Sequence, residues 1–148
     1  MFFEDFEVGT RFETGSRALS EADIMAYARV YDPQPFHVDR EAAAQSIYGG
    51  IIASGLQTCA VAFALTLEAN VFNEASMGSP GMDRIRWLRP VRPGDAIRVT
   101  GTVIEITPSA SRPDRGRIVI DYAVRNQNSE TVLTYAITHL LRRRDESN

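Results

Sequence analysis

The chain has 148 residues, of which 44% are hydrophobic and 24% are charged, and its formal net charge is −3. These values are typical of one globular domain, here expected over residues 1–148, and they exclude an intrinsically disordered chain. A slightly acidic chain gives no reason to expect a nucleic-acid partner. All 16 basic residues are arginine, which excludes any mechanism that needs a lysine Schiff base.

The sequence favours a cytoplasmic protein without a membrane partner. Residues 1–7 are acidic where a secretory signal peptide needs basic residues. The most apolar stretch, residues 51–72, is interrupted by polar side chains, whereas a membrane span needs about 20 predominantly apolar residues. The single cysteine, Cys59, cannot form a disulfide within the chain.

The first part of the chain is expected to form a short strand, near residues 10–18, and then a helix. Ser20-Glu-Ala-Asp23 resembles a capping box with Asp in place of Glu. The apolar residues that follow, among them Ile24 and Ala28, have the spacing of one helix face. This helix is expected to end before the two prolines of the next segment.

The segment Tyr31–His37, with the sequence Tyr-Asp-Pro-Gln-Pro-Phe-His, contains one of the two histidines of the chain. Asp32 and His37 are five residues apart and would not share a helix face. Pro33 and Pro35 disfavour a regular helix, so the segment is predicted to be a rigid loop. Such a loop can direct both side chains to one point, as acid–base chemistry requires. Taken singly, each residue is more typical of a turn or a structural role.

The rest of the chain predicts one long helix and an antiparallel sheet. Asp39 can cap a short helix over residues 40–47, which Gly49-Gly50 would end. Residues 51–72 are apolar on nearly all sides, which predicts a helix that other structure must enclose. Later segments have the alternating pattern of strands, at residues 82–88, 96–107, 117–125 and 131–141. The expected fold class is therefore α+β, with a buried central helix wrapped by an antiparallel meander.

A single sheet of this kind leaves its edge strands exposed. Pairing of two sheets edge to edge would remove this exposure, so we expect a homodimer or a dimer of dimers. Near the C-terminus, His139 shares a strand face with apolar residues and is expected to be a packed or an edge histidine. The run Arg142–Arg144 is expected to be solvated.

Taken in order, these motifs resemble the MaoC-like dehydratases, hotdog-fold proteins that include the (R)-specific enoyl-CoA hydratases. The family pattern is Asp-x-Asn-Pro-x-His, an Asp, an Ala-rich helix, a Gly, and a small-His-Gly sequence. It corresponds here to Asp32-Pro-Gln-Pro-Phe-His37, Asp39, Ala42–Ala44, Gly49-Gly50 and Ala53-Ser54-Gly55, with Leu88–Asp95 matching a later linking phrase. Two positions depart from the pattern, because Gln34 replaces Asn and Ser54 replaces His.

The resemblance implies a single hotdog domain whose short helices carry the active-site loop. It also implies reversible addition of water to a trans-2-enoyl-CoA, giving a 3-hydroxyacyl-CoA, with Asp32 and His37 as the catalytic pair. The Gly55 N–H, near the start of the long helix, is suited to stabilise the thioester oxygen. The residues expected to contact the substrate are Ser54, Gly50, Tyr31 and Phe36. No metal and no cofactor is expected, since CoA is part of the substrate.

Two other functions stay open. A hotdog thioesterase usually has a carboxylate in or just before the long helix, whereas Glu68 is the only acid in this helix and lies near its far end. A non-catalytic acyl-CoA-binding subunit is disfavoured by the presence of both Asp32 and His37, although Ser54 leaves room for it. The sequence does not select the arginines that would bind CoA phosphates from the candidates Arg84, Arg86, Arg89, Arg92, Arg112, Arg115 and Arg117.

Overall fold

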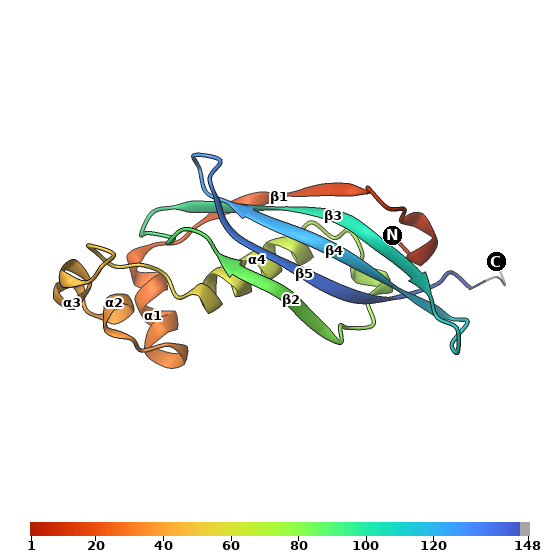
Figure 1. Cartoon of the computed structure of the whole chain (residues 1–148), viewed down its shortest axis with the longest axis horizontal. Coiled ribbons are helices and arrows are strands. Elements are labelled where there is room, and N and C mark those ends of the chain that lie inside the picture. Colours follow the sequence, from red (N-terminus) through yellow and green to blue (C-terminus); the bar gives the residue numbers. More distant parts are fainter. Residues whose placement is uncertain (146–148) are drawn as a thin grey trace.

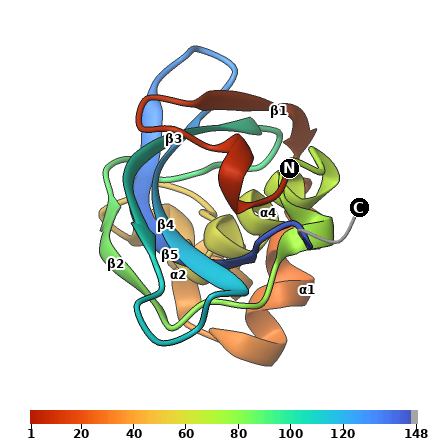
Figure 2. The same cartoon turned by 90° about the vertical axis from the view of Figure 1, so that its right-hand side faces the viewer.

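The computed structural model describes residues 1–145. Five antiparallel strands form one sheet that curves around the central helix α4, and three short helices lie together at one end of the molecule (Figures 1 and 2). The elements in chain order are η1 (Phe3–Asp5), β1 (Arg11–Ala18), α1 (Glu21–Tyr31), α2 (Pro35–Val38), α3 (Arg40–Gln45), α4 (Gly55–Glu68), η2 (Asn73–Ala75), β2 (Gly81–Trp87), β3 (Ala96–Pro108), β4 (Arg115–Arg125) and β5 (Thr131–Arg142). The expected α+β class is confirmed.

The order of the strands in the sheet is β1-β3-β4-β5-β2. The expected meander is confirmed for β3, β4 and β5, whereas β2 precedes β3 in the chain but pairs with β5 at the opposite edge. The segment between β2 and β3 does not form a hairpin, because its backbone forms hydrogen bonds with the residues that precede α1 and α4. The Ala53 N–H donates to Val91 O at 2.8 Å, and the Leu19 N–H donates to Asp95 O at 2.9 Å. This segment therefore holds the approach to α4 in place.

The core lies between the concave face of the sheet and one side of α4. Strand residues alternate between this core and the outer face, and the core residues are mainly β-branched, as a pleated surface favours. The largest fully buried strand side chains are Ile97, Val99, Val103, Ile118, Ile120, Val124, Val132, Leu133 and Leu141. Ala62 and Leu65 of α4 pack against them. Burial of each large apolar side chain contributes about 1.5–3 kcal/mol.

Helix α4 is not enclosed on all sides, which corrects the expectation from the sequence. Leu56 is 53% exposed and Phe63 is 43% exposed, and they lie on the side of the helix that the sheet does not cover. The helix also begins at Gly55 rather than at residue 51. The Ser54 hydroxyl accepts a hydrogen bond from the Leu56 N–H and so caps the first turn.

The short helices confirm two predicted caps and correct one predicted loop. Ser20 and Asp23 form the capping box of α1, and the Asp39 carboxylate accepts from the first N–H groups of α3. The expected loop is instead a one-turn helix, α2, that starts at Pro35 and contains His37. A proline at the first helical position loses no hydrogen bond, because that N–H has no partner in any helix.

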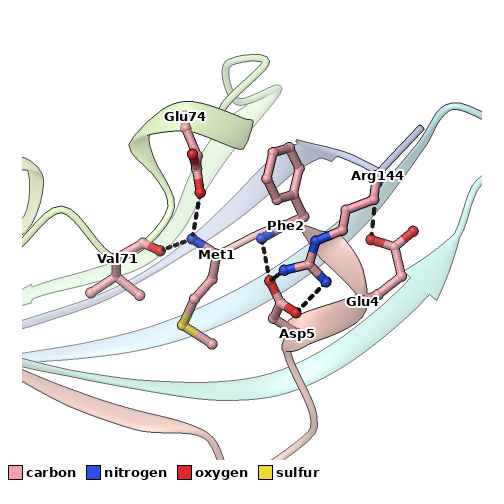
Figure 3. Close-up of polar contacts among 7 residues, drawn as sticks. All are labelled: Met1, Phe2, Glu4, Asp5, Val71, Glu74 and Arg144. Carbon is pink, nitrogen blue, oxygen red and sulfur yellow. Dashed lines mark hydrogen bonds and ion pairs between the residues drawn. The ribbon is translucent and has the colours of Figure 1, made fainter. Parts of the chain in front are cut away.

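The two ends of the described chain lie side by side (Figure 3). The Arg144 guanidinium donates to both carboxylate oxygens of Asp5, at 2.8 and 2.7 Å, and Arg143 donates to Glu4 at 2.9 Å. The Phe2 N–H and the Arg144 guanidinium lower the pKa of Asp5. Arg142 and Arg144 are exposed, as expected for this run, and Arg143 and Arg144 in addition form ion pairs with the N-terminal segment. Exposed ion pairs of this kind contribute only about 0–1 kcal/mol each.

Of the two positions expected for His139, the structure shows the packed one. Its Nε2 atom lies 2.7 Å from the Tyr122 hydroxyl, and its ring lies 4.5 Å from that of Phe72. Burial lowers its pKa from 6.5 to about 4. His139 is therefore neutral in the folded protein at neutral pH.

The buried His139 predicts acid sensitivity. Between pH 6.5 and about 4 the unfolded state binds a proton that the folded state does not, so the free energy of unfolding falls as the pH decreases. The loss from this residue is on the order of 3 kcal/mol. His139→Gln does not titrate and should lose less stability between pH 7 and pH 4.5, as measured by urea denaturation. Equal losses in the two proteins would contradict this origin of acid sensitivity.

Candidate active site

Three segments of the chain meet at the N-terminal end of α4. Asp32 follows the last residue of α1, His37 lies in α2, and Ser54 precedes α4. The Asp32 Oδ2 atom lies 3.2 Å from His37 Nε2 and accepts a hydrogen bond of 2.7 Å from the Ser54 hydroxyl. The fold therefore brings Asp32 and His37 into contact, although they are five residues apart.

Both ring nitrogens of His37 face oxygen atoms. Its side chain is 4% exposed, and Nδ1 is 2.6 Å from the carbonyl oxygen of Ile52. A carbonyl oxygen only accepts, so Nδ1 must carry a hydrogen and Nε2 faces Asp32. If Nε2 had no hydrogen, its lone pair would oppose a carboxylate lone pair at 3.2 Å. A hydrogen on Nε2 as well would make this contact an imidazolium–carboxylate ion pair.

Asp32 is held as a carboxylate by donors on both oxygens. Gln34 Nε2 donates to Oδ1 at 2.7 Å, while Ser54 and His37 face Oδ2. Burial alone would raise the pKa of Asp32, but the hydrogen bonds from Ser54 and Gln34 and the charge of His37 outweigh burial and lower this pKa. The pair thus consists of an ionised carboxylate beside a buried imidazole.

Gly55 is the first residue of α4. Its N–H has no acceptor within the helix and lies at the positive end of the helix dipole. The position has no room for a side chain, because a Cβ atom would lie 2.5 Å from Cε2 of Trp87. The indole of Trp87 therefore packs directly against the start of α4.

A cleft of about 580 Å³ opens beside the Asp32–His37 pair. The polar residues and Gly55 stand among apolar walls, as is typical of small-molecule sites. The lining residues are Asp32, Gln34, Phe36, His37, Tyr48, Ile52, Ala53, Gly55, Leu56, Thr58, Trp87, Leu88, Arg89, Pro90, Val91 and Val132.

Of the four residues expected to contact substrate, one lines this cleft and three do not. Phe36 lines it, with its ring 4.5 Å from that of His37. Tyr31 is 67% exposed, lies in a tilted ring contact with Tyr27 and does not line the cleft. Gly50 also lies outside the cleft lining, and Ser54 is fully buried behind Asp32.

Sequence reasoning missed Trp87 as a lining residue and could not select Arg89 from the seven candidate arginines. They belong to β2 and the segment after it, and the pairing of β2 with β5 brings them to the cleft. Only the alternation of residues 82–88 indicated a strand, and this pattern contains no information about its partner strand. Gln34 was noted only as a replacement for Asn, whereas it holds the second oxygen of Asp32.

Within residues 1–145, no group of three or more His, Cys, Asp or Glu side chains is placed to hold a metal ion. None of the helices in that part of the chain is long and apolar enough to cross a membrane. The cytoplasmic location stays a prediction.

A sheet curved around one long helix is the arrangement of a hotdog fold, and here polar side chains gather at the start of that helix. A family model described as "MaoC like domain" matches residues 5–120. The chain therefore belongs to the MaoC-like dehydratase family.

Individual relatives agree with this assignment. The chain is 32% identical over 143 residues to the uncharacterized protein YdeM of Bacillus subtilis, a match that covers 97% of this chain and 100% of YdeM. It is 29% identical over 117 residues to a 3-hydroxybutyryl-CoA dehydratase of Methylorubrum extorquens, covering 76% of this chain and 69% of that protein. The crystal structure of a MaoC-like dehydratase from Rhodospirillum rubrum is similar with a TM-score of 0.92 and 38% identity, over 98% of this chain and 99% of that one.

Proposed function

We propose that this protein catalyses the reversible addition of water to a trans-2-enoyl-CoA, giving a 3-hydroxyacyl-CoA. The observation that carries the proposal is the 3.2 Å contact between Asp32 and His37 at a cleft that Gly55 also lines. A relative that is named as a 3-hydroxybutyryl-CoA dehydratase supports an acyl-CoA thioester as the substrate. Arg89 lines the cleft and is the candidate for binding a CoA phosphate.

In the hydration direction, Asp32 acts as the base and His37 as the acid. The thioester oxygen accepts from the Gly55 N–H, which stabilises the negative charge that develops on this oxygen. The oxygen of water adds to the β-carbon while Asp32 takes one of its protons. The proton on His37 Nε2 passes to the α-carbon.

The contact between Asp32 and His37 also allows both side chains to return to their starting protonation states. After the addition, Asp32 carries a proton and His37 Nε2 carries none. Because Oδ2 and Nε2 are 3.2 Å apart, the proton can pass directly from the carboxyl to the imidazole. One water is consumed, one C–O and one C–H bond form, and there is no net oxidation or reduction.

Loss of the conjugated thioester absorbance tests this reaction, with short, branched and medium-length enoyl-CoAs as substrates. We expect the protein to hydrate at least one of these enoyl-CoAs without releasing CoA thiol. Release of thiol would instead indicate a thioesterase. Binding without either reaction would indicate an acyl-CoA-binding subunit, and binding can be followed by the fluorescence of Trp87, the single tryptophan of the chain.

The thioesterase alternative has less structural support. Glu68 is the only acid of α4, and it forms an ion pair with Arg17 at the end of the helix opposite to Gly55. A carboxylate at that end is far from the cleft beside Asp32. The hydratase mechanism uses side chains that already touch each other.

We further propose a homodimer. Leu56 and Phe63 form an exposed apolar stripe on α4, and the outer edge of β2 has no partner strand among the described residues.

Phe63→Glu is therefore expected to shift the protein from twice 16.4 kDa toward 16.4 kDa, as measured by sedimentation equilibrium. Val8→Glu, at another exposed apolar residue, should leave the dimer intact. A wild-type protein that sediments as a monomer would refute the dimer.

A further inference from the structure

Ser54 makes two hydrogen bonds that connect α4 to the Asp32–His37 pair. Its side chain is 0% exposed, and its Oγ atom lies 3.3 Å from the Leu56 N–H and 2.7 Å from Asp32 Oδ2. The Leu56 N–H can only donate, so Oγ accepts there and its own hydrogen is directed to Asp32. The direction of both bonds is therefore determined by the chemistry of the partners.

Gln34 completes the support of the carboxylate. It donates to Oδ1 at 2.7 Å, so each oxygen of Asp32 has a donor other than His37. Two anchored oxygens define the plane of the carboxylate, and Oδ2 is thereby held 3.2 Å from His37 Nε2. If the Ser54 hydroxyl were absent, His37 would be the only group in contact with Oδ2. The Asp32 carboxylate could then pivot about the hydrogen bond between Oδ1 and Gln34.

We propose that Ser54 is a positioning residue, which keeps Asp32 ionised and holds its Oδ2 atom against His37, and that it does not contact substrate. Its full burial behind Asp32 and its absence from the cleft lining support this role. The proposal rests on the hydratase function for its effect on catalysis. The predicted effect on Asp32 itself does not require turnover.

The decisive variant is Ser54→Ala, which removes the donor to Oδ2. Carbon-13 NMR of the Asp32 carboxyl, assigned by comparison with Asp32→Asn, should show that the pKa of Asp32 rises. In the kcat/KM profile, the acid limb should move to higher pH. A fall in kcat of about 10-fold or more is expected, with little change in KM, because a hydrogen bond to a charged group is lost. Ser54→Thr keeps the hydroxyl and should restore both readouts.

Ser20→Ala is the matched control for the loss of a helix cap. Ser20 caps α1 through the Asp23 N–H at 3.1 Å and does not line the cleft. This variant should lower stability, as Ser54→Ala does, without changing the titration of Asp32 or the pH profile. Ser54→Gly also removes the hydroxyl, and because glycine is tolerated at a helix N-cap, it takes the place of Ser54→Ala if that variant does not fold.

The outcomes separate the two proposals. A changed Asp32 titration in a protein that hydrates no enoyl-CoA would refute the proposed function and keep the positioning role of Ser54. An unchanged Asp32 titration in Ser54→Ala, or in Ser54→Gly if only that variant folds, would overturn the positioning role even if the wild-type protein is an active hydratase.

Discussion

Asp32→Asn is expected to lower kcat/KM for enoyl-CoA hydration by about 10³-fold while leaving the fold intact. Asparagine keeps the shape of the side chain and can still accept a hydrogen bond from Ser54, but it cannot take a proton from water. It also removes the negative charge opposite His37. The measurement is the initial rate of absorbance loss at saturating and at limiting substrate.

Asp39→Asn is the control for this variant, because it removes the same charge two residues from His37 at a helix cap outside the cleft. It should retain the rate of the wild-type enzyme. His37→Gln should resemble Asp32→Asn, and the double variant should be little slower than either single one, since the pair acts as a unit. An Asp32→Asn variant that keeps more than about one tenth of the activity would exclude the proposed base, given the usual size of acid–base effects.

Gly55→Ala is expected to destabilise the protein by about 1–3 kcal/mol, the usual cost of overpacking. The alanine keeps the backbone N–H, but its Cβ would lie 2.5 Å from Cε2 of Trp87. The indole must therefore move, which should lower the melting temperature and change the tryptophan emission. Because Trp87 lines the cleft, activity should fall as well.

Gly50→Ala is the control for Gly55→Ala, since the nearest atom to its Cβ would be Arg92 Nη1 at an ordinary 3.8 Å. The double variant Gly55→Ala/Trp87→Ala should lose less stability than the sum of the single variants, because the clash is absent. The hydration rate of the double variant would also show whether the N–H of residue 55 can stabilise the thioester oxygen when Trp87 is absent. Emission and melting of Gly55→Ala equal to the wild-type values would refute the predicted clash between its Cβ and Trp87.

Alternation along the chain predicted the strands well. The segments 96–107 and 131–141 correspond to β3 (Ala96–Pro108) and β5 (Thr131–Arg142). The capping residues of α1 and α3 were also predicted, because caps depend on neighbours within four residues. The predicted loop at His37 was wrong, since proline disfavours a helix interior but suits its first residue.

By itself the sequence determined the residue types available for chemistry, namely Asp32, His37 and Gly55, and the elements that carry them. These depend on short motifs and on the period of each segment. The tertiary structure decided their partners: Ile52 O orients His37, and the Ser54 hydroxyl reaches Asp32 from 22 residues away. It also placed β2 beside β5, which brought Trp87 against Gly55. Such contacts depend on how elements distant in the chain pack together, and no local pattern of residues specifies that packing.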